Sequence, residues 1–345
     1  MKEVLIISLN SGGTMGHGKI ISSLANFLVG KKKGVTLISD MPFTKNFILN
    51  KKVVKENIKM VPHENYTIGG MCHCIQKNEI YDYAIRNKIE CVIFSTFFDL
   101  SLVRKFKNSN IKTILLSYPI RDTFRLALKQ NRVYSNFDKI ITLYGPCFLD
   151  KKISNEILVN PLKLAKNKIN KNESYDILVT CGGGGRPSSN IFLKKAIKSL
   201  EKVINDFPNK KLKIKIIKGN SKVKIKNKKI ESMIWTKNFG SLISSSKVII
   251  SEAGFYTMLD LINYRKKAIL IPGERIIDNQ ELRALKLEEI GIGKVFFPFE
   301  DYSKLSKFIL KELDDYKQKK NNFEKIKLKF NKHPELGCAM LEELK

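Results

Sequence analysis

The order of apolar and polar positions predicts alternating strands and helices. Short β-branched runs at 4–9, 35–38, 91–94, 113–116 and 139–143 are typical of strands buried on both faces of a parallel sheet. A helical pattern follows the first run, and helical stretches lie between most of the others. This alternation predicts an α/β fold on doubly wound parallel sheets.

The same pattern starts again in the second half of the chain. The polar segment 151–174 predicts a linker, and further strands are expected at 175–180, 212–217, 248–250 and 268–272. Helices are expected over 189–206 and 281–290, and the Lys-rich tail 303–332 predicts an amphipathic helical region. We therefore expect two Rossmann-like domains, an N-terminal one over 1–158 and a C-terminal one over 159–325, followed by a C-terminal helix over 326–345.

The composition agrees with two globular domains. The 345 residues are 43% hydrophobic and 28% charged, enough to bury a sizeable core. No apolar run reaches the ~18–20 residues that cross a bilayer. The first apolar stretch is short and follows an early Glu3, unlike a secretory signal. With only six cysteines, a disulfide scaffold is not expected, so the sequence predicts a cytoplasmic protein.

The formal net charge of +30 is spread along the chain. Residues 1–160 hold 24 basic and 12 acidic residues, and the remainder holds 39 and 21. Of the 63 basic residues only 9 are Arg, although phosphate and base recognition often recruit Arg. A basic nucleic-acid-binding protein is therefore one interpretation of the charge, but the chain has no RNP-like, helix-turn-helix or zinc-finger pattern.

Two glycine-rich turns each join a predicted strand to a predicted helix. The first spans Ser11–His17, and the second, Cys181–Pro187, holds four consecutive glycines. Neither turn is a dinucleotide fingerprint or a P-loop. Both offer backbone N–H groups at a helix N-terminus, where a phosphate can approach without interference from a side chain. Close packing of strand and helix would explain one such turn equally well, whereas a pair, one in each domain, favours phosphate binding.

Two further patterns concern metal and ribose binding. Cys72-His73-Cys74 has a poor spacing for zinc, and no second cluster supplies further ligands, so no metal is expected. Asp260 follows the predicted strand 248–250 on the next helix. A carboxylate there suits the hydroxyls of a ribose, whereas the alternative is a surface Asp in a helix pair.

Four stretches share one resemblance. They are S-G-G-T-M-G-H at 11–17, C-G-G-G-G-R-P-S-S-N at 181–190, S-E-A-G-F-Y-T-M-L-D at 251–260, and D-N-Q at 278–280, which continues to Gly291 as A-x-x-L-E-x-x-G. In this order they resemble the loops of MurG-like GT-B glycosyltransferases, of the glycosyltransferase family 28 type. The resemblance implies two Rossmann-like domains facing a central cleft, with the C-terminal helix packed back on the domains.

The resemblance also implies roles for individual residues. The acceptor or phosphate loop would be formed by Gly12, Gly13, Thr14 and Gly16. The UDP-sugar donor would be bound by Gly182, Gly183, Gly184, Gly185, Arg186, Asn190, Ser251, Ala253, Gly254, Thr257, Asp260, Asp278, Asn279 and Gln280. His17 would be the catalytic base, since a group that titrates near neutrality suits proton removal from an acceptor hydroxyl. A carboxylate such as Asp99 or Asp122 is the alternative base.

The expected reaction is an inverting, metal-independent transfer. No D-x-D triplet is present to hold a bridging metal, so backbone amides of 182–185 would stabilise the leaving diphosphate. The sugar expected from the resemblance is N-acetylglucosamine. The expected acceptor is a lipid-linked or cell-envelope precursor, of the peptidoglycan or pseudomurein kind. A UDP-sugar hydrolase or a UDP-sugar 2-epimerase of the same fold is the alternative.

The acceptor half departs from the family pattern. Ser95–Leu100 stands where a second glycine loop, G-G-Y-x-S-G-P, is expected, and Ser117–Asp122 stands near the place of H-E-Q-N. Apolar and basic residues mix over 100–107 and 118–134. Such a mixture fits a peripheral contact with an anionic membrane and equally fits core helices with solvated faces.

Overall fold

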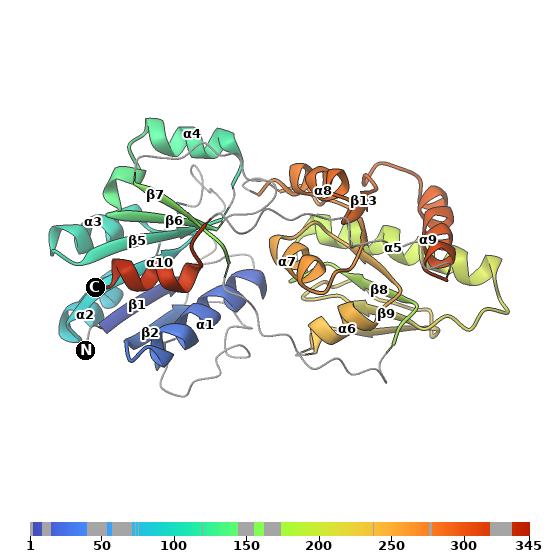
Figure 1. The fold of residues 1–345 in the computed structure, drawn as a ribbon, viewed down its shortest axis with the longest axis horizontal. Helices are drawn as coiled ribbons and strands as arrows, with labels where there is room; N and C mark the ends of the chain where they lie inside the picture. The colour runs from blue at the N-terminus through green and yellow to red at the C-terminus, as the bar shows by residue number, and fades with distance from the viewer. Residues whose placement is uncertain are drawn as a thin grey trace. The chain divides into compact units, whose positions relative to one another are not determined.

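The computed structural model describes residues 3–8, 15–39, 54–56, 71–72, 74, 76–118, 120–143, 155–161, 174–236, 238–275, 278–317 and 333–345. The chain divides into two compact units (Figure 1). Unit 1 comprises Met1–Leu164 and Lys329–Lys345, and unit 2 comprises Ala165–Leu328. The last segment of the chain therefore belongs to the first unit.

Unit 1 contains a seven-stranded parallel sheet in the order β3-β2-β1-β4-β5-β6-β7. The strands are β1 (Glu3–Ser8), β2 (Gly34–Ser39), β3 (Val54–Glu56), β4 (Ile89–Ser95), β5 (Lys112–Ser117), β6 (Lys139–Leu143) and β7 (Glu156–Val159). The helices are α1 (Met15–Gly30), α2 (Lys77–Arg86), α3 (Leu100–Asn108), α4 (Asp122–Gln130), the short 3-10 helix η2 (Tyr134–Asn136) and α10 (Leu336–Glu343). The doubly wound parallel sheet is confirmed.

The apolar face of α3 belongs to the core of unit 1. Leu102, Val103 and Phe106 have no exposed surface, and the Phe106 ring lies 6.2 Å from that of Phe94 on β4. Leu102, Val103 and Phe106 are therefore core positions and not part of a membrane-facing patch, whereas Leu100 is half-buried. Leu126 on α4 is different, because it is 55% exposed.

The predicted linker contains the edge strand β7, which the sequence analysis missed. Its Glu156 is only 9% exposed, and this polar residue made the segment resemble a loop. The carboxylate is satisfied inside unit 1, because Oε2 accepts a hydrogen bond from Arg125 at 2.8 Å and Oε1 accepts one from Thr142 at 2.6 Å. Ile157, Leu158 and Val159 then follow as an ordinary apolar strand.

Unit 2 contains a six-stranded parallel sheet in the order β10-β9-β8-β11-β12-β13. The strands are β8 (Ile177–Thr180), β9 (Ile214–Ile217), β10 (Ile230–Met233), β11 (Val248–Ser251), β12 (Ala268–Leu270) and β13 (Gly293–Val295). The helices are α5 (Pro187–Asp206), α6 (Phe239–Ser245), α7 (Phe255–Asn263), α8 (Gln280–Glu289) and α9 (Tyr302–Lys317). The predicted tail helix over 303–332 corresponds to α9 as far as residue 317.

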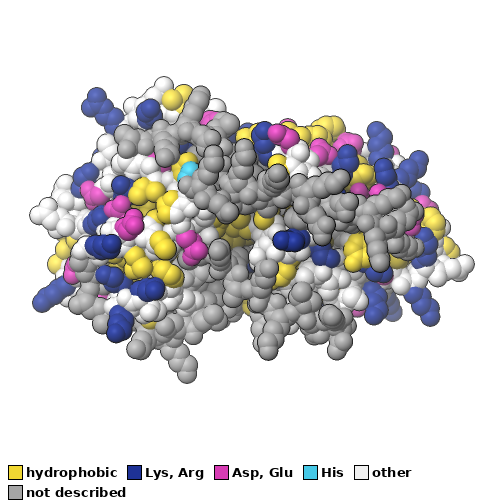
Figure 2. Space-filling model, viewed as in Figure 1, with side chains coloured by type: hydrophobic (Ala, Val, Ile, Leu, Met, Phe, Trp, Pro, Cys, Tyr) yellow, Lys and Arg dark blue, Asp and Glu magenta, His cyan; other side chains and the backbone are white. Residues whose placement is uncertain are grey.

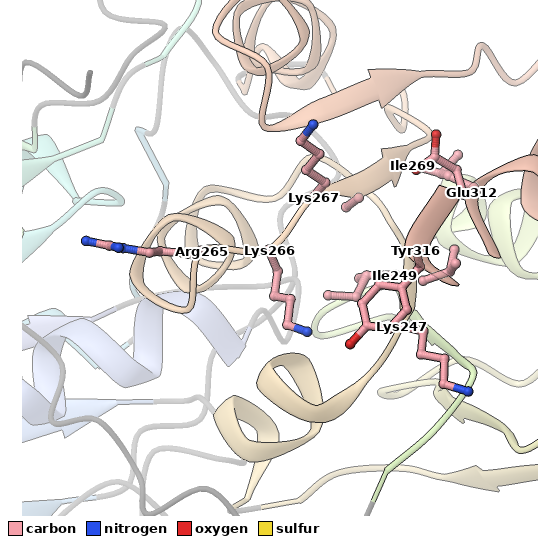
Figure 3. Close-up of a pocket in the computed structure, with 10 residues that line it drawn as sticks. Lys247, Ile249, Arg265, Lys266, Lys267, Ile269, Glu312 and Tyr316 are labelled. Atoms are coloured by element: carbon pink, nitrogen blue, oxygen red, sulfur yellow. The ribbon is translucent and has the colours of Figure 1, made fainter. Parts of the chain in front are cut away.

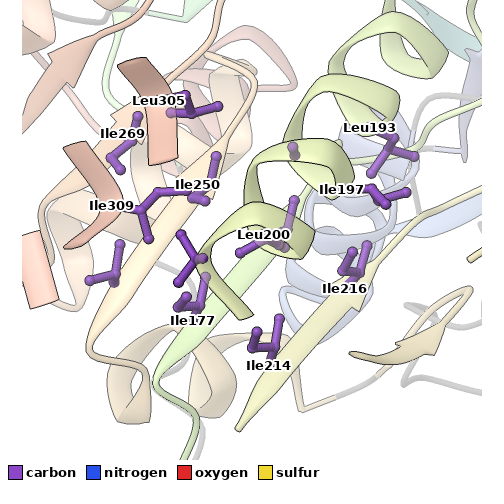
Figure 4. Close-up of a cluster of buried hydrophobic side chains, with 14 of the residues drawn as sticks. Ile177, Leu193, Ile197, Leu200, Ile214, Ile216, Ile250, Ile269, Leu305 and Ile309 are labelled. Carbon is purple, nitrogen blue, oxygen red and sulfur yellow. The ribbon is translucent and has the colours of Figure 1, made fainter. Parts of the chain in front are cut away.

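The core of unit 2 lies between its sheet and the helices α5 and α9 (Figure 4). Alternate residues of a strand point to the same face, and the pairs Ile177 with Val179 and Ile214 with Ile216 follow this rule. Leu193 and Leu200 of α5 meet them, and α9 adds further apolar side chains. This packing fixes the start of α5, which follows the four glycines.

Each sheet reverses its strand order at one point. In unit 1 this point lies between β1 and β4, and in unit 2 it lies between β8 and β11. Ligands of doubly wound sheets bind outside the carboxyl ends of the strands at such a point. We therefore expect ligand binding at the loops that follow Ser8 and Ser95 in unit 1 and at those that follow Thr180 and Ser251 in unit 2.

Among the described residues on the face seen in Figure 2, Lys and Arg side chains are scattered and interspersed with Asp and Glu. This distribution agrees with the even spread of charge along the sequence. Among the described residues, no helix combines the length and the hydropathy that a membrane span requires.

Candidate functional site

The four glycines form a tight turn between β8 and α5 in unit 2. Gly182, Gly184 and Gly185 have φ values of 62°, 62° and 79°, a backbone region that favours glycine. At Gly184 a Cβ atom would lie 2.6 Å from the carbonyl oxygen of Lys218, whereas at Gly182 it would meet open space. The turn therefore needs glycine for its conformation, and at Gly184 also for close packing.

Two of the four glycine N–H groups in this turn donate hydrogen bonds within the fold. The N–H of Gly182 donates to Thr180 Oγ1 at 3.2 Å, and that of Gly184 donates to the carbonyl of Cys181 at 3.3 Å. Within the described part of the chain, the N–H groups of Gly183 and Gly185 donate to no protein group. Gly184 is buried, Gly183 is half-buried and Gly185 is exposed. Two amides beside the start of α5 are thus left for an anion.

A buried ionic cluster lies next to this turn. Glu252, which follows β11, is 3% exposed, and Arg275 from the loop after β12 donates to both of its carboxylate oxygens at 3.0 and 3.1 Å. Ser189 in the first turn of α5 donates to the same carboxylate. Arg275 also contacts Ser188. The cluster joins the ends of β11 and β12 to the start of α5.

Burial raises the pKa of Glu252, and the guanidinium of Arg275, the hydroxyl of Ser189 and the charge of Arg186 oppose this rise. Glu252 lies between Ser251 and Ala253 in the stretch S-E-A-G. The cluster was not identified from the sequence, because its partners are separated by 23 and 63 positions. The unusual carboxylate between Ser251 and Ala253 was the one available signal.

The predicted donor residues after β11 lie on one loop and helix. Ser251 is the last residue of β11, and Gly254 precedes the first residue of α7. Thr257 and Asp260 lie on α7 and are 6% and 4% exposed. Ala253 offers its carbonyl to Arg283 at 2.7 Å, so this loop is tied to α8.

The predicted residues at the start of α8 make contacts inside unit 2. Asp278 binds the guanidinium of Arg283, which is 1% exposed, at 2.5 and 3.2 Å. Asn279 caps α8 by accepting the N–H of Leu282 at 3.1 Å. Gln280 Oε1 accepts the N–H of Gly273 at 2.9 Å. These side chains hold the shape of the loop that faces the carboxyl edge of the sheet.

Asn190 has a comparable internal contact. Its Oδ1 accepts the hydroxyl of Ser221 at 2.6 Å. Ser221 belongs to the loop that packs over the glycine turn, where the N–H of Asn220 also donates to the carbonyl of Gly183 at 2.8 Å. Asn190 therefore supports the turn from the second turn of α5.

Comparison with known proteins also indicates a functional site in this part of the chain. Residues 176–335 match the glycosyltransferase family 28 C-terminal domain, which includes the glycine turn, the Glu252 cluster and α8. This protein is a glycosyltransferase. No protein of curated function matches the chain at a significant level of sequence similarity.

The fold of the glycosyltransferase is that of GT-B enzymes. A kitacinnamycin glycosyltransferase superposes with a TM-score of 0.68 at 11% identity, covering 99% of this chain and 98% of that one. MurG of Acinetobacter baumannii gives 0.60 at 12%, covering 100% and 99%. VinC, solved in complex with DTDP, gives 0.67 at 12%, covering 99% and 98%. The predicted GT-B architecture of two Rossmann-like halves is confirmed.

In unit 1 of the glycosyltransferase, a strained residue lies beside unpaired hydroxyls. Thr96, directly after β4, has a φ of 67°, which is unusual for a β-branched residue. Its Oγ1 and the hydroxyls of Ser8 and Ser95 are buried, and none has a hydrogen-bond partner among the residues that the structure describes. Strained residues and unsatisfied polar groups are frequent at functional sites. These three side chains lie at the carboxyl ends of β1 and β4, where the strand order reverses.

Asp99 is a structural cap of α3. Its carboxylate accepts the N–H of Leu102 at 3.1 Å, the hydroxyl of Ser101 at 2.6 Å and the N–H of Cys74 at 2.9 Å. Burial alone would raise the pKa of Asp99, but these hydrogen bonds and Lys77 hold it below its usual range. A carboxylate with a lowered pKa is a weak base, so Asp99 is poorly suited to proton abstraction. Asp122 is exposed at the start of α4.

Only some of the other site residues predicted in unit 1 are among the residues that the structure describes. Gly12, Gly13 and Thr14 lie outside the described residues, while Gly16 and His17 lie in the first turn of α1. Cys74 is buried, which raises the pKa of its thiol to about 11, and His73 lies outside the described residues. Among the residues that the structure describes, no group of three or more His, Cys, Asp or Glu is placed to bind a metal.

Proposed function

We propose that this glycosyltransferase moves a sugar from a UDP-sugar, with N-acetylglucosamine as the sugar, to a lipid-linked or cell-envelope acceptor of the peptidoglycan or pseudomurein kind. The observation that carries the donor half of this proposal is the pair of open amides at Gly183 and Gly185, beside the start of α5. Fixed N–H groups can stabilise the charge that develops on a leaving diphosphate, without any reorganisation during the reaction.

The donor would be held by three elements of unit 2. The amides of 183 and 185 would bind the diphosphate, and Arg186 would add a positive charge. Asp260 on α7 would hydrogen-bond the ribose hydroxyls. Asp278, Asn279, Gln280 and Asn190 would act through the loops that they hold in place. This mode of binding requires no metal ion.

The acceptor would be bound by unit 1. The unpaired hydroxyls of Ser8, Ser95 and Thr96 are suited to a polar acceptor group, because each can both donate and accept a hydrogen bond. Ser95 and Thr96 stand where the family's second glycine loop is expected, so the acceptor would be held through hydroxyls instead of backbone amides. His17 in the first turn of α1 would remove the proton of the attacking hydroxyl.

A peripheral membrane contact at the cytoplasmic face would follow from a lipid-linked acceptor. Leu126 on α4 is exposed, and Lys129 and Arg132 nearby are exposed as well. An apolar residue with cations beside it can rest on an anionic leaflet. Sedimentation with anionic and neutral vesicles at low salt tests this contact, and equal binding to both contradicts it. Leu126→Glu should reduce binding to the anionic vesicles.

A titration of the purified chain with nucleotide sugars tests the donor assignment. We expect UDP-N-acetylglucosamine to bind more tightly than dTDP-glucose, and its affinity to be unchanged by EDTA. With an acceptor present, NMR of the product should show inversion of the anomeric centre. Retained configuration, loss of binding in EDTA, or release of free sugar at full rate without acceptor would contradict the proposal.

A further inference from the structure

A cavity of about 170 Å³ lies at the amino ends of β11 and β12, at the opposite end of these strands from the proposed donor site (Figure 3). Its walls come from the segment before β11, the segment before β12 and the last turns of α9. One water occupies about 30 Å³ in the liquid. The space is therefore sufficient for a small polyatomic ion.

The charges around this cavity are unequal. Among the described residues, Lys247, Arg265, Lys266 and Lys267 line it, and Glu312 is the one acidic residue that does so. Lys247 is neutralised by Asp176, at 2.6 Å. In Figure 3, Arg265 extends away from the other labelled side chains. In the same view Lys267 extends away from Lys266 and Tyr316, so Lys266 is the cation that remains beside the Tyr316 ring to face a ligand.

Lys266 is an ammonium group without an acidic partner. Its Nζ donates to the carbonyl of Ser246 at 3.0 Å and lies 5.6 Å from the centre of the Tyr316 ring. Within the described residues, no carboxylate lies within ion-pair distance of it. Burial lowers the pKa of this lysine. The side chain is half-buried, and a partly desolvated cation without a counter-ion would be stabilised by an anion in the cavity.

Glu312 does not supply the missing charge. Burial raises the pKa of its carboxyl, the neighbouring Asp315 raises it further, and Lys267 is among the cations that oppose the rise. Figure 3 shows Glu312 beside Ile269, whereas Lys266 points toward Lys247 and Tyr316. The carboxyl therefore lies at a different part of the wall from the ammonium group of Lys266.

We propose that this cavity is a second anion site of the glycosyltransferase, separate from the donor site, which binds a small soluble ligand bearing a phosphate or diphosphate group. Lysines bind phosphate as point charges, and Lys266 would provide that charge. The Tyr316 ring and the apolar side chains of Ile249 and Ile269 would contact the rest of the ligand. A bound ligand would link β11 and β12 to α9.

Chemical labelling of lysines tests this site directly, with the full chain and inorganic pyrophosphate as the probe. Trace acetylation is measured by mass spectrometry at Lys266 and, as an internal control, at Lys202, a residue of α5 whose side chain is 38% exposed and pairs with Asp206. We expect pyrophosphate to slow the labelling of Lys266 about threefold or more relative to Lys202. Sodium chloride at the same ionic strength should leave that ratio unchanged. An unchanged ratio with pyrophosphate would overturn the proposal.

Two variants and one further probe complete the test. The thermal stabilisation of unit 2 by pyrophosphate should be reduced in Lys266→Met and in Tyr316→Leu, and unchanged in the matched control Lys202→Met. Equal stabilisation of all three variants contradicts the site. Vesicles containing phosphatidic acid separate a soluble ligand from a lipid headgroup, because protection of Lys266 by vesicles alone would overturn the soluble-ligand assignment. The labelling result in the natural chain stands even where a variant fails to fold.

Discussion

The buried pair of Glu252 and Arg275 allows a quantitative test of how unit 2 holds its loops. Glu252 is 3% exposed, and the side chain of Arg275 is 10% exposed, so both charges are largely removed from water. Removal of one partner of such a pair leaves the other buried without compensation. Mutational data for buried pairs give about 3–5 kcal/mol for that change. We therefore expect Glu252→Ala to lower the free energy of unfolding of unit 2 by about 3–5 kcal/mol.

The double variant separates the pair from the rest of the site. If the cost of Glu252→Ala arises from the unpaired guanidinium, Glu252→Ala with Arg275→Met should lose less than the sum of the two single variants. The coupling in this double-mutant cycle should be about 1–3 kcal/mol. Ser189→Ala is the matched smaller change, since it removes one hydrogen bond to the carboxylate and should cost about 1.5–3 kcal/mol.

The single tryptophan makes this measurement specific. Trp235 is the only one in the chain and lies in unit 2, so its fluorescence reports on the unfolding of that unit. Urea titrations followed by the fluorescence of this residue give the differences in the free energy of unfolding between variants. The slope of that free energy against urea concentration is taken as equal in all variants. A cost below about 1 kcal/mol for Glu252→Ala, or costs that add without coupling, would refute the interpretation.

Three further predictions follow from described features. Gly184→Ala should destabilise unit 2 more than Gly182→Ala. Both substitutions place alanine in a left-handed backbone, which costs about 1–2 kcal/mol, but only the methyl group added at position 184 meets the Lys218 carbonyl. Equal costs of the two substitutions in urea titrations would argue against this packing. Asp99→Asn should make the stability of unit 1 less dependent on acid pH. A carboxyl whose folded pKa is lowered stabilises the fold above its unfolded pKa of 3.8 and loses that contribution as the pH falls through the lower folded pKa. Circular dichroism should show a smaller loss of folded signal between pH 5 and pH 3 than in the natural chain, and an unchanged loss would contradict this role of Asp99. Asp260→Asn should weaken the binding of UDP about tenfold and should weaken the binding of 2′-deoxy-UDP less, as measured by calorimetry. An equal loss of affinity for both nucleotides would mean that Asp260 does not contact the ribose.

The regular part of the fold is predictable from the sequence because its signals are local. Buried parallel strands are continuous apolar runs, and Val248–Ile250 or Lys139–Leu143 need no tertiary information to be recognised. β7 was missed because Glu156 is polar, and only its partners Arg125 and Thr142 make it a buried strand residue. That compensation is a property of the folded unit.

The same distinction applies to the candidate site. The glycine turn could be identified from four adjacent letters, whereas its position at the strand-order reversal follows from the sheet topology of the structure. Glu252, Arg275 and the buried Arg283 could not be connected, because their contacts span loops from different strands. Asp278 was predicted as a donor ligand, and its bond to Arg283 five residues later gives it a role in holding the loop.

The return of the chain to unit 1 has a consequence for synthesis on the ribosome. Leu336, Met340 and Leu344 of the last segment are buried in unit 1, and Lys112 binds the carboxylate of Glu343 at 2.8 Å. Unit 2 is continuous over Ala165–Leu328, so all of it is translated before α10 appears. Domains generally fold from the N-terminus during translation. Here the first domain to begin folding must wait for the final residues to complete its structure, while the second can finish earlier.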